Sequence, residues 1–358
     1  MVRTLERHEL TTLGRGYGVL GSGGGGTTTM WQLILAESPL WPLTVFGVED
    51  LPDETPCVAV AFGGSTLLLG ERIPGDAPFA PLVDAAERWT GVRARAVCAL
   101  EGAGLNGLSP FSLADELAVV DADLMGRALP RLDQLTLFVD RVPGTVTICS
   151  TGADGVVVID TARAADVEKL ARSAIVQAGG MSAVLVAGFT VGDLREHAVT
   201  GGLDRAMRLG RAFEHDGAAP SLPELADALA ARLLGVGRVM TVETTPDDPF
   251  ASTIEIRADD GALLRVIARS ETLAFMRDGQ VESVTPEIIV TVDSLSRSVL
   301  QVDGFTIGRH VAILALPAPE WWTQTPERLA TVSPAAYGLS GLDGPCGSDG
   351  LPGMGGTP

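Results

Sequence analysis

The chain has 358 residues and a formal net charge of −19, and 46% of its residues are hydrophobic. Its 43 glycines and 22 prolines stay below the roughly 25–30% that marks low-complexity disorder, so the chain can bury a core, and its length suggests about two domains. The acidic balance, without a run of Arg or Lys, excludes binding to nucleic acid and to an anionic membrane surface. No apolar run reaches the roughly 18 residues that would span a bilayer.

The first 165 residues alternate between short apolar runs and helical patterns. Val19–Leu20, just before a glycine run, is expected to end a strand. Further predicted strands are Pro56–Phe62, Ala94–Leu100 and Ala118–Asp121, and predicted helices are Thr27–Glu37, Pro81–Thr90 and a segment that begins with Ser112 as its cap. This alternation predicts a mostly parallel sheet with flanking helices, whose ligands bind beyond the carboxyl ends of the strands.

The pattern changes after residue 145. A predicted hairpin spans Thr145–Asp160, and helical pattern follows at Ala164–Gln177, 202–213 and 222–234, with a strand at Ala183–Phe189 between them. Residues 237–316 are mostly strands. We therefore predict an α/β fold with an N-terminal domain over residues 1–165 and a C-terminal, β-rich α+β domain over residues 166–337.

Residues 338–358 form a separate tail in which glycine recurs at every third position. This is the period of collagen, but the run is too short to hold a triple helix alone. We predict a disordered tail. The alternative is a segment that assists trimer formation.

The scattered cysteines indicate a reducing compartment. Cys57, Cys98, Cys149 and Cys346 have no CxxC spacing, which in a chain of this size is typical of reduced thiols. The polar start MVRTLERHEL does not resemble a secretory signal. The expected location is the cytoplasm.

The glycine run is the first candidate for a binding site. Consecutive glycines allow backbone N–H groups to point into one concavity, so this segment could cradle a phosphate, a carboxylate or an oxyanion. The alternative is a tight turn without a ligand. No GK[ST] follows, and no acidic residue lies at the distance of a dinucleotide fingerprint, so we expect no nucleotide cofactor. The candidate residues are Ser22, Gly23, Gly24, Gly25 and Gly26.

Polar side chains follow two of the predicted strands. Glu101 comes directly after one strand and precedes Asn106, while Asp121 and Asp123 end another and precede Arg127. One carboxylate could act as a general base, and Asp121, Asp123 and Glu101 together could hold a divalent metal ion. Arg127 could bind a substrate oxygen. The alternative for the second group is an ion-paired loop that fixes the edge of the sheet.

Histidines and cysteines are weaker candidates. His197 lies near a glycine turn and could be a base, a substrate contact or a metal ligand. The chain lacks the His-x-His spacing of amidohydrolase zinc sites. Cys98 lies inside an apolar run and is expected to be an inert, buried thiol.

Three segments resemble the S-methyl thiohydantoin desulfurase family, a former domain of unknown function associated with hydantoinases and oxoprolinases. The segments LGSGGGGTT, EGAGLN and VVDADLMGRALP are similar to that family's LGTGGGG, E-[IV]-GG-x-N and D-x-D-x-MGRA-x-PE motifs. Further likeness lies in Arg269–Leu273, in Pro286–Ile289 and near Gly308–Val311. The resemblance covers roughly residues 5–340.

The resemblance implies hydrolysis of a thiohydantoin- or hydantoin-like ring, with water attacking the carbon that bears sulfur. On that basis the catalytic candidates are Asp121, Asp123, Glu101 and Arg127. The glycine run, Asn106 and His197 are the candidate substrate contacts. The implied partner is a small-molecule substrate, and we expect a homo-oligomer.

This sequence departs from the usual family motifs at several positions, which leaves other functions open. Arg131 stands where the family has Glu, Ala103 where it has Gly, Ser270 where it has Asn and Gly202 where we expect Thr. One alternative is a binding subunit or pseudoenzyme without turnover. Another is a biosynthetic tailoring enzyme that catalyses cyclisation or dehydration on the same scaffold.

Overall fold

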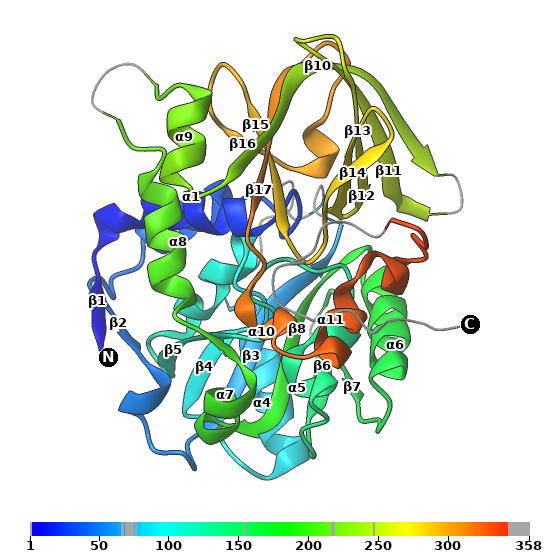
Figure 1. Ribbon diagram of the computed structural model, residues 1–358. Coiled ribbons are helices and arrows are strands. Elements are labelled where there is room, and N and C mark those ends of the chain that lie inside the picture. Colours follow the sequence, from blue (N-terminus) through cyan, green and yellow to red (C-terminus); the bar gives the residue numbers. More distant parts are fainter. Residues whose placement is uncertain are drawn as a thin grey trace.

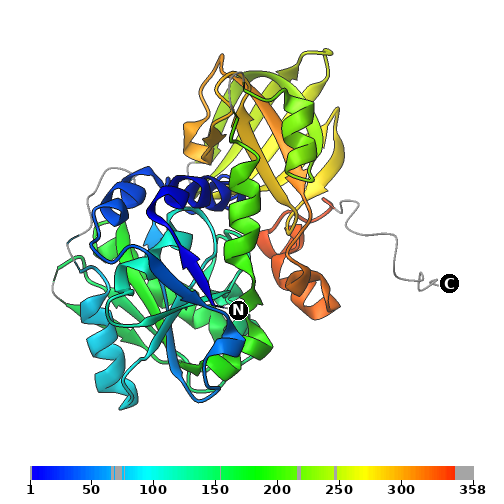
Figure 2. The ribbon, with the colours of Figure 1, turned by 90° about the vertical axis from the view of Figure 1, so that its left-hand side faces the viewer.

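The computed structural model describes residues 2–65, 68, 75, 77–153, 155–215, 219–245 and 248–342. These residues form two sheets, one in the lower and one in the upper half of Figure 1, with most of the helices around the lower sheet. The second view shows that helix α8 runs alongside both halves (Figure 2). Among the described residues no helix is both long enough and apolar enough to cross a membrane.

The first sheet has a parallel centre and antiparallel edges. Strands β2, β5, β4 and β3 pair in parallel in this order, β1 and β8 extend the sheet on its two sides, and β6 and β7 follow β8. The short strand β9 pairs with β5. The bounds are β1 Arg3–Leu5, β2 Leu43–Phe46, β3 Pro56–Gly64, β4 Ala96–Ala99, β5 Ala118–Asp123, β6 Val146–Ser150, β7 Val156–Ile159, β8 Met181–Thr190 and β9 Val199–Thr200.

Both faces of this sheet are buried. In β3, Val58, Val60 and Phe62 pack into one apolar cluster, while Cys57, Ala59 and Ala61 pack into another. Successive side chains of a strand point to opposite faces, so a continuous apolar strand needs cover on both sides. That cover includes α1 Leu10–Leu20, α2 Thr29–Ala36, α4 Ala80–Thr90, α5 Thr136–Val139, α6 Ala164–Gln177 and α7 Val191–His197.

The second sheet is antiparallel throughout, in the order β14-β13-β12-β11-β10-β17-β15-β16. In β12, buried and half-buried residues alternate, which is the pattern of a strand with one face on a core. The bounds are β10 Arg232–Thr245, β11 Asp248–Ala258, β12 Leu263–Arg269, β13 Glu271–Arg277, β14 Gln280–Val284, β15 Ile288–Asp293, β16 Val299–Leu300 and β17 His310–Leu316. This architecture confirms the predicted α/β fold with a β-rich second part.

The remaining helices connect or flank the sheets. The α-helices are α8 Gly202–Arg211, α9 Leu222–Ala228, α10 Glu320–Thr323 and α11 Pro326–Val332. The 3₁₀ helices are η1 Arg7–Glu9, η2 Val48–Asp50, η3 Gly104–Leu113, η4 Leu132–Gln134, η5 Val302–Gly304 and η6 Pro334–Tyr337.

Three predicted elements were wrong in detail. The segment before the glycine run is a helix, because Leu10, Leu13, Tyr17 and Leu20 form one buried helical face and Val19–Leu20 is only its last turn. No helix begins at Ser112, whose hydroxyl instead donates to the Ser109 carbonyl within η3. The helix predicted over 222–234 ends at Ala228, and β10 starts at Arg232.

The first sheet extends past the predicted boundary at residue 165. Strands β8 and β9 both follow that residue, yet they pair with β3 and β5. Both strands pair antiparallel, so the sequence had no signal of a parallel crossover that would have assigned them to the first sheet. Most of the predicted tail, including Cys346, lies outside the described residues.

Candidate functional site

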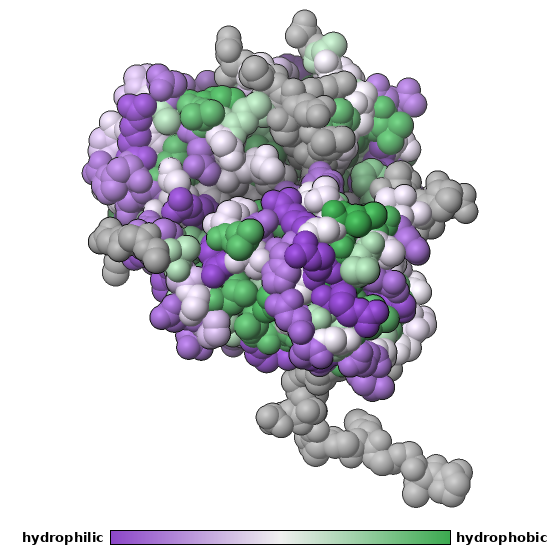
Figure 3. All heavy atoms as spheres, turned by 90° about the horizontal axis from the view of Figure 1, so that it is seen from above, coloured by the Kyte–Doolittle hydropathy of each residue, from purple (hydrophilic) through white to green (hydrophobic). Residues whose placement is uncertain are grey.

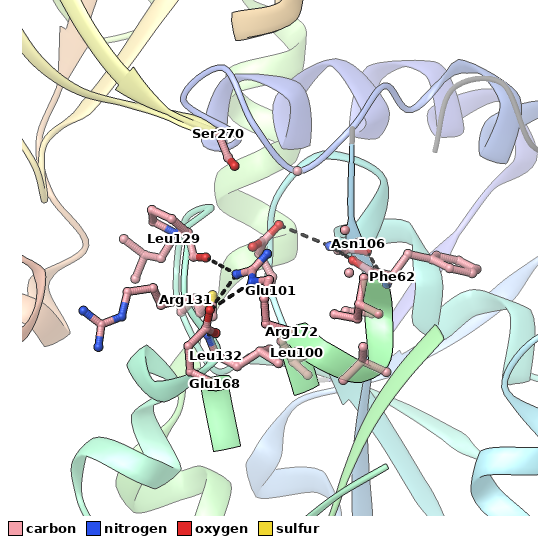
Figure 4. A pocket seen from close by; sticks show the side chains of 18 of the residues that line it. Phe62, Leu100, Glu101, Asn106, Leu129, Arg131, Leu132, Glu168, Arg172 and Ser270 are labelled. Carbon is pink, nitrogen blue, oxygen red and sulfur yellow. Dashed lines mark hydrogen bonds and ion pairs between the residues drawn. The ribbon is translucent and has the colours of Figure 1, made fainter. Parts of the chain in front are cut away.

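A cavity of about 80 Å³ lies where the carboxyl ends of the parallel strands face the second sheet (Figure 4). Each wall comes from a different part of the chain. The first sheet supplies the end of β3 and the segments that follow β4 and β5, α6 supplies Arg172, and the second sheet supplies Ser270 and Glu271. Gly25 of the glycine run also lines it. We call this cavity the acid pocket.

Glu101 is one of two buried carboxyls in the acid pocket. It lies directly beyond β4 and is 7% exposed. Its Oε1 accepts a hydrogen bond from Asn106 Nδ2 at 3.3 Å. Burial, followed by the nearby charge of Glu271, raises the pKa of the Glu101 carboxyl well above its usual value, although the bonds from Asn106 and from the Leu129 backbone oppose the rise.

Asn106 fixes Glu101 to the neighbouring strand. Its Oδ1 accepts from the Phe62 N–H at 2.8 Å, and its Nδ2 donates to the Phe62 carbonyl at 3.0 Å. Both amide ends are thus held by the backbone of β3, and the remaining N–H is directed to Glu101 (Figure 4). Asn106 was predicted to contact substrate. The structure places it at the wall of the acid pocket, where its hydrogen bonds hold Glu101 in position.

Glu271 is the second buried carboxyl, and the sequence analysis did not select it. It opens β13 and is 4% exposed. Its Oε2 is buried and has no hydrogen-bond partner among the described residues. Burial raises the pKa of Glu271 to about 8, against the opposing charges of Arg127 and Arg172. The available signal was its position in Arg269–Leu273, one of the segments that resemble the family.

The glycine run lies between the two carboxyls. A Cβ on Gly24 would overlap the Glu271 carboxylate, and a Cβ on Gly25 would lie 3.0 Å from Glu101 Oε1. Gly23, Gly25 and Gly26 all have left-handed φ angles, between 74° and 86°. Glycine is therefore required here for close approach and for backbone conformation.

Ser22 attaches this run to the second sheet instead of facing the pocket. Its Oγ donates to the Ile289 carbonyl at 2.9 Å and accepts from the Ile289 N–H at 3.1 Å. Its carbonyl accepts from the Thr272 N–H at 2.7 Å, and the carbonyl of Gly23 accepts from Val302 at 2.7 Å. Ser22 and Gly23, at the start of the predicted ligand cradle, thus join the two halves of the molecule.

Arg127 is fully buried beside the acid pocket and binds backbone carbonyls. Its Nε donates to Ala128 at 2.9 Å, and its guanidinium reaches the carbonyls of Thr272, Pro286 and Glu287 in the second sheet. Burial lowers the pKa of Arg127, while the charges of Tyr337, Glu271 and Glu101 oppose this. Arg127 is thus a buried cation that joins the two sheets, and its charge opposes the rise in the pKa of Glu271.

The two aspartates lie apart from the acid pocket and line a small space of about 20 Å³ beside Tyr17. Asp123 is buried, and its Oδ1 accepts from the N–H groups of Met125, at 2.8 Å, and Gly126. Asp121 Oδ1 accepts from the Leu203 N–H at the start of α8 at 2.8 Å. Burial raises the pKa of Asp121 to about 6 and also raises the pKa of Asp123.

His197 lies at the end of α7 and does not line the acid pocket. Its Nδ1 is 2.8 Å from Asp140 Oδ2, and Asp140 also accepts from Arg328. Cys98 is fully buried, and burial raises the pKa of its thiol, which agrees with the predicted inert role. Among the residues that the structure describes, no group of three His, Cys, Asp or Glu is arranged to hold a metal, so the proposed metal ion stays a prediction.

The lining of the acid pocket also includes paired charges. Arg172 donates to Glu168 Oε1 at 2.7 Å and to the Pro130 carbonyl at 2.9 Å, while Glu168 accepts from the Leu132 N–H (Figure 4). Arg131 pairs with Asp133. Ser270 also lines the acid pocket and has a left-handed φ of 62°. This conformation favours glycine or asparagine, in agreement with the asparagine of the family motif.

Two family models match consecutive parts of the chain. The S-Me-THD-like N-terminal domain matches residues 8–161 and the S-Me-THD-like C-terminal domain matches residues 162–343. No curated protein matches the chain. The crystal structure of a protein from Chromobacterium violaceum, determined by a structural genomics consortium, has the same fold, with a TM-score of 0.79, 23% identity and coverage of 96% of this chain and 98% of that one. The family models span nearly all of the sequence, and the chain therefore belongs to the S-Me-THD-like family.

Proposed function

We propose that this protein is a hydrolase that acts on a small heterocycle of the thiohydantoin or hydantoin type and releases a thiol or another ring substituent. The family name supports this reaction class. The observation that carries it is Glu271, a buried carboxyl with an unpartnered oxygen that lines the same cavity as Glu101. A buried polar atom without a partner is costly in a folded protein unless a ligand or water completes it.

The two carboxyls differ in what surrounds them, and this difference assigns their roles. Burial and the charge of Glu271 raise the pKa of Glu101 well above its usual value, despite the bonds from Asn106 and the Leu129 backbone, and so favour its protonated form. The pKa of Glu271 is about 8, and the charges of Arg127 and Arg172 favour its ionised form. Repulsion between the pair keeps both from ionising together. Glu271 is therefore the general base and Glu101 the general acid.

The reaction balances with these two groups. Water attacks the ring carbon that bears sulfur and is double-bonded to a ring nitrogen, and Glu271 takes a proton from the water as the C–O bond forms. Glu101 donates its proton to sulfur as the C–S bond breaks and recovers one from the new hydroxyl as the carbonyl forms. Glu271 passes its proton to the ring nitrogen. The net change is addition of one water and release of one thiol.

The other predicted residues support this pair. Arg127 and Arg172 supply positive charge to Glu271. The glycine run brings the two carboxyls together, and Asn106 orients Glu101. Asp121 and Asp123 hold the loop after β5 and the start of α8, so we assign them a positioning role.

The test is thiol release from S-alkyl thiohydantoins, followed with a thiol-reactive chromophore, with the ring product identified by mass spectrometry. We expect turnover by the wild type and loss of turnover in Glu101→Gln and Glu271→Gln. Glu116→Gln, at an exposed position, is the matched control. Metal analysis of the purified protein tests the metal prediction in parallel. Binding without turnover by the wild type would contradict the hydrolase and favour the binding subunit.

A further inference from the structure

A second cavity, of about 310 Å³, lies on the other side of the glycine run. Gly26 lines it, whereas the adjacent Gly25 lines the acid pocket, and the two cavities share no lining residue. Its walls come from α1, from the start of α2 and from the segment between β15 and β16. We call it the arginine cavity. It is lined by Gly14, Arg15, Gly18, Gly26, Thr27, Thr28, Thr29, Phe213, His215, Ser296, Arg297, Ser298, Val299 and Gln301.

The charge of the arginine cavity differs from that of the whole chain. The protein carries 45 acidic residues against 26 Lys and Arg. Nevertheless, two arginines and no Asp or Glu occur among the described residues that line this cavity. At the acid pocket, by contrast, Arg131 and Arg172 each pair with a carboxylate. The arginine cavity is thus a locally cationic space in a strongly anionic protein.

Arg297 has donor capacity that the described residues leave unused. Its Nε donates to the Pro220 carbonyl at 2.8 Å, which fixes the guanidinium. Its Nη1 is buried and has no partner among the described residues. Leaving a charged donor buried and unbonded is unfavourable, so this geometry indicates an acceptor supplied from outside the chain. Arg15, exposed on α1, has no ion pair with a described residue either.

Hydroxyl groups complete the donor set. Thr27, Thr28 and Thr29 lie at one wall, and Ser296 and Ser298 at the wall that carries Arg297. The two serine hydroxyls are hydrogen-bonded to each other at 2.8 Å, so this pair has one O–H left to donate to a ligand. The threonines precede and open α2, whose first N–H groups have no acceptor within the helix. Guanidinium forks, hydroxyls and N–H groups are the donors that bind phosphate oxygens in proteins.

We propose that the arginine cavity binds the phosphoryl group of a small organic phosphate, independently of the proposed hydrolysis. Two arginines, with no Asp or Glu among the described residues that line the cavity, suit a group with about two negative charges better than a single carboxylate. The cavity volume is at the lower end of the roughly 300–1,000 Å³ typical of small-ligand sites, so it has room for more than a bare ion.

The test measures binding of inorganic phosphate, pyrophosphate and glycerol phosphate to the full chain by calorimetry at low ionic strength. Backbone amide shifts of Gly26–Thr29 in NMR spectra locate the site. We expect saturable binding to the wild type, a Kd at least fivefold higher in Arg297→Ala and in Arg15→Gln, and no binding in the double variant. The matched control is Arg88→Gln, another exposed helical arginine, which lies outside the cavity and should leave Kd unchanged.

The Arg15→Gln variant keeps the test valid if Arg297→Ala fails to fold. Arg15 is exposed, so its replacement removes a charge without disturbing the core. The proposal is wrong if none of the three probes binds the wild type at millimolar concentration. It is equally wrong if Arg15→Gln and Arg88→Gln bind the probes as tightly as the wild type. Binding of the organic phosphate alone, with neither inorganic ion bound, supports the proposal and shows that the organic part contributes.

Discussion

Two pairs of acidic residues lie near the carboxyl ends of the parallel strands. The pairs differ in how their carboxylate oxygens are hydrogen-bonded. Asp121 and Asp123 accept hydrogen bonds from the backbone at the start of α8 and in the loop after β5. Glu101 and Glu271 line an open cavity, and Glu271 retains an oxygen without a partner among the described residues. Both pairs are largely buried and both have raised pKa values.

The comparison shows that a raised pKa alone does not identify a catalytic carboxyl. Burial raises the pKa in all four residues, whether the group holds a loop or faces a ligand. The distinguishing feature is the unfilled hydrogen-bonding capacity at the cavity. Variants that remove one carboxyl at a time can therefore separate the two pairs by rate and by stability.

The largest effect is expected from Glu271→Gln. The amide keeps the size of the side chain but cannot take a proton from water, so we expect kcat for thiol release to fall at least about a hundredfold, the usual contribution of general acid–base catalysis. The measurement is steady-state kinetics beside the exposed control Glu116→Gln. A fall of less than tenfold, in a variant whose circular dichroism matches the wild type, would remove Glu271 from the chemistry.

The pH dependence of stability gives the next largest effect. Glu271 titrates near 8 in the folded protein and near 4.5 when unfolded, so between these values the folded state holds a proton that the unfolded chain has lost. The free energy of unfolding therefore falls as pH rises through this window, by about 1.4 kcal/mol per pH unit for this group. Glu271→Gln should lose this slope, as measured by urea unfolding at several pH values.

Asp121→Asn is the matched comparison for that titration. The folded pKa of Asp121 is about 6, so its contribution to the slope ends two pH units lower than that of Glu271. Between pH 6 and 8 we expect Asp121→Asn to follow the wild type, whereas Glu271→Gln should differ from it. Equal slopes for all three proteins in that range would contradict the pKa assigned to Glu271.

Asp123→Asn should act on stability more than on chemistry. Asp123 Oδ1 accepts from Met125 and Gly126, and a backbone bond from Gly102 also lowers its pKa. An amide offers one acceptor oxygen and brings an N–H₂ group toward these donors, so we expect a loss of about 1–3 kcal/mol in the free energy of unfolding. The kcat of the folded variant should change less than tenfold. A loss as large as that of Glu271→Gln would return Asp123 to the catalytic group.

Much of the fold followed from local pattern, because β3 is a continuous apolar run and α4 and α6 each carry a clear apolar period. The site followed only in part. Glu101, Asn106 and Gly25 do line one cavity, since each comes from a strand end or a loop at the same edge of the sheet. Glu271 arrives from the second sheet, and its place depends on long-range contacts such as the bonds of Ser22 to Ile289. The hydrophobic periodicity of the sequence does not predict those contacts.

The smallest effect is expected from His197→Gln. The ring is half-buried and bonded to Asp140, which keeps Arg328 as a partner after the change. A half-exposed bond of this kind contributes about 0–1 kcal/mol, so the thermal midpoint should shift by only a few degrees at most. Because His197 does not line the acid pocket, kcat/KM for thiol release should stay within twofold of the wild type. A larger fall in kcat/KM with unchanged stability would mean that α7 moves toward the pocket when substrate binds, and the comparison would then have to include His197 beside Glu101 and Glu271.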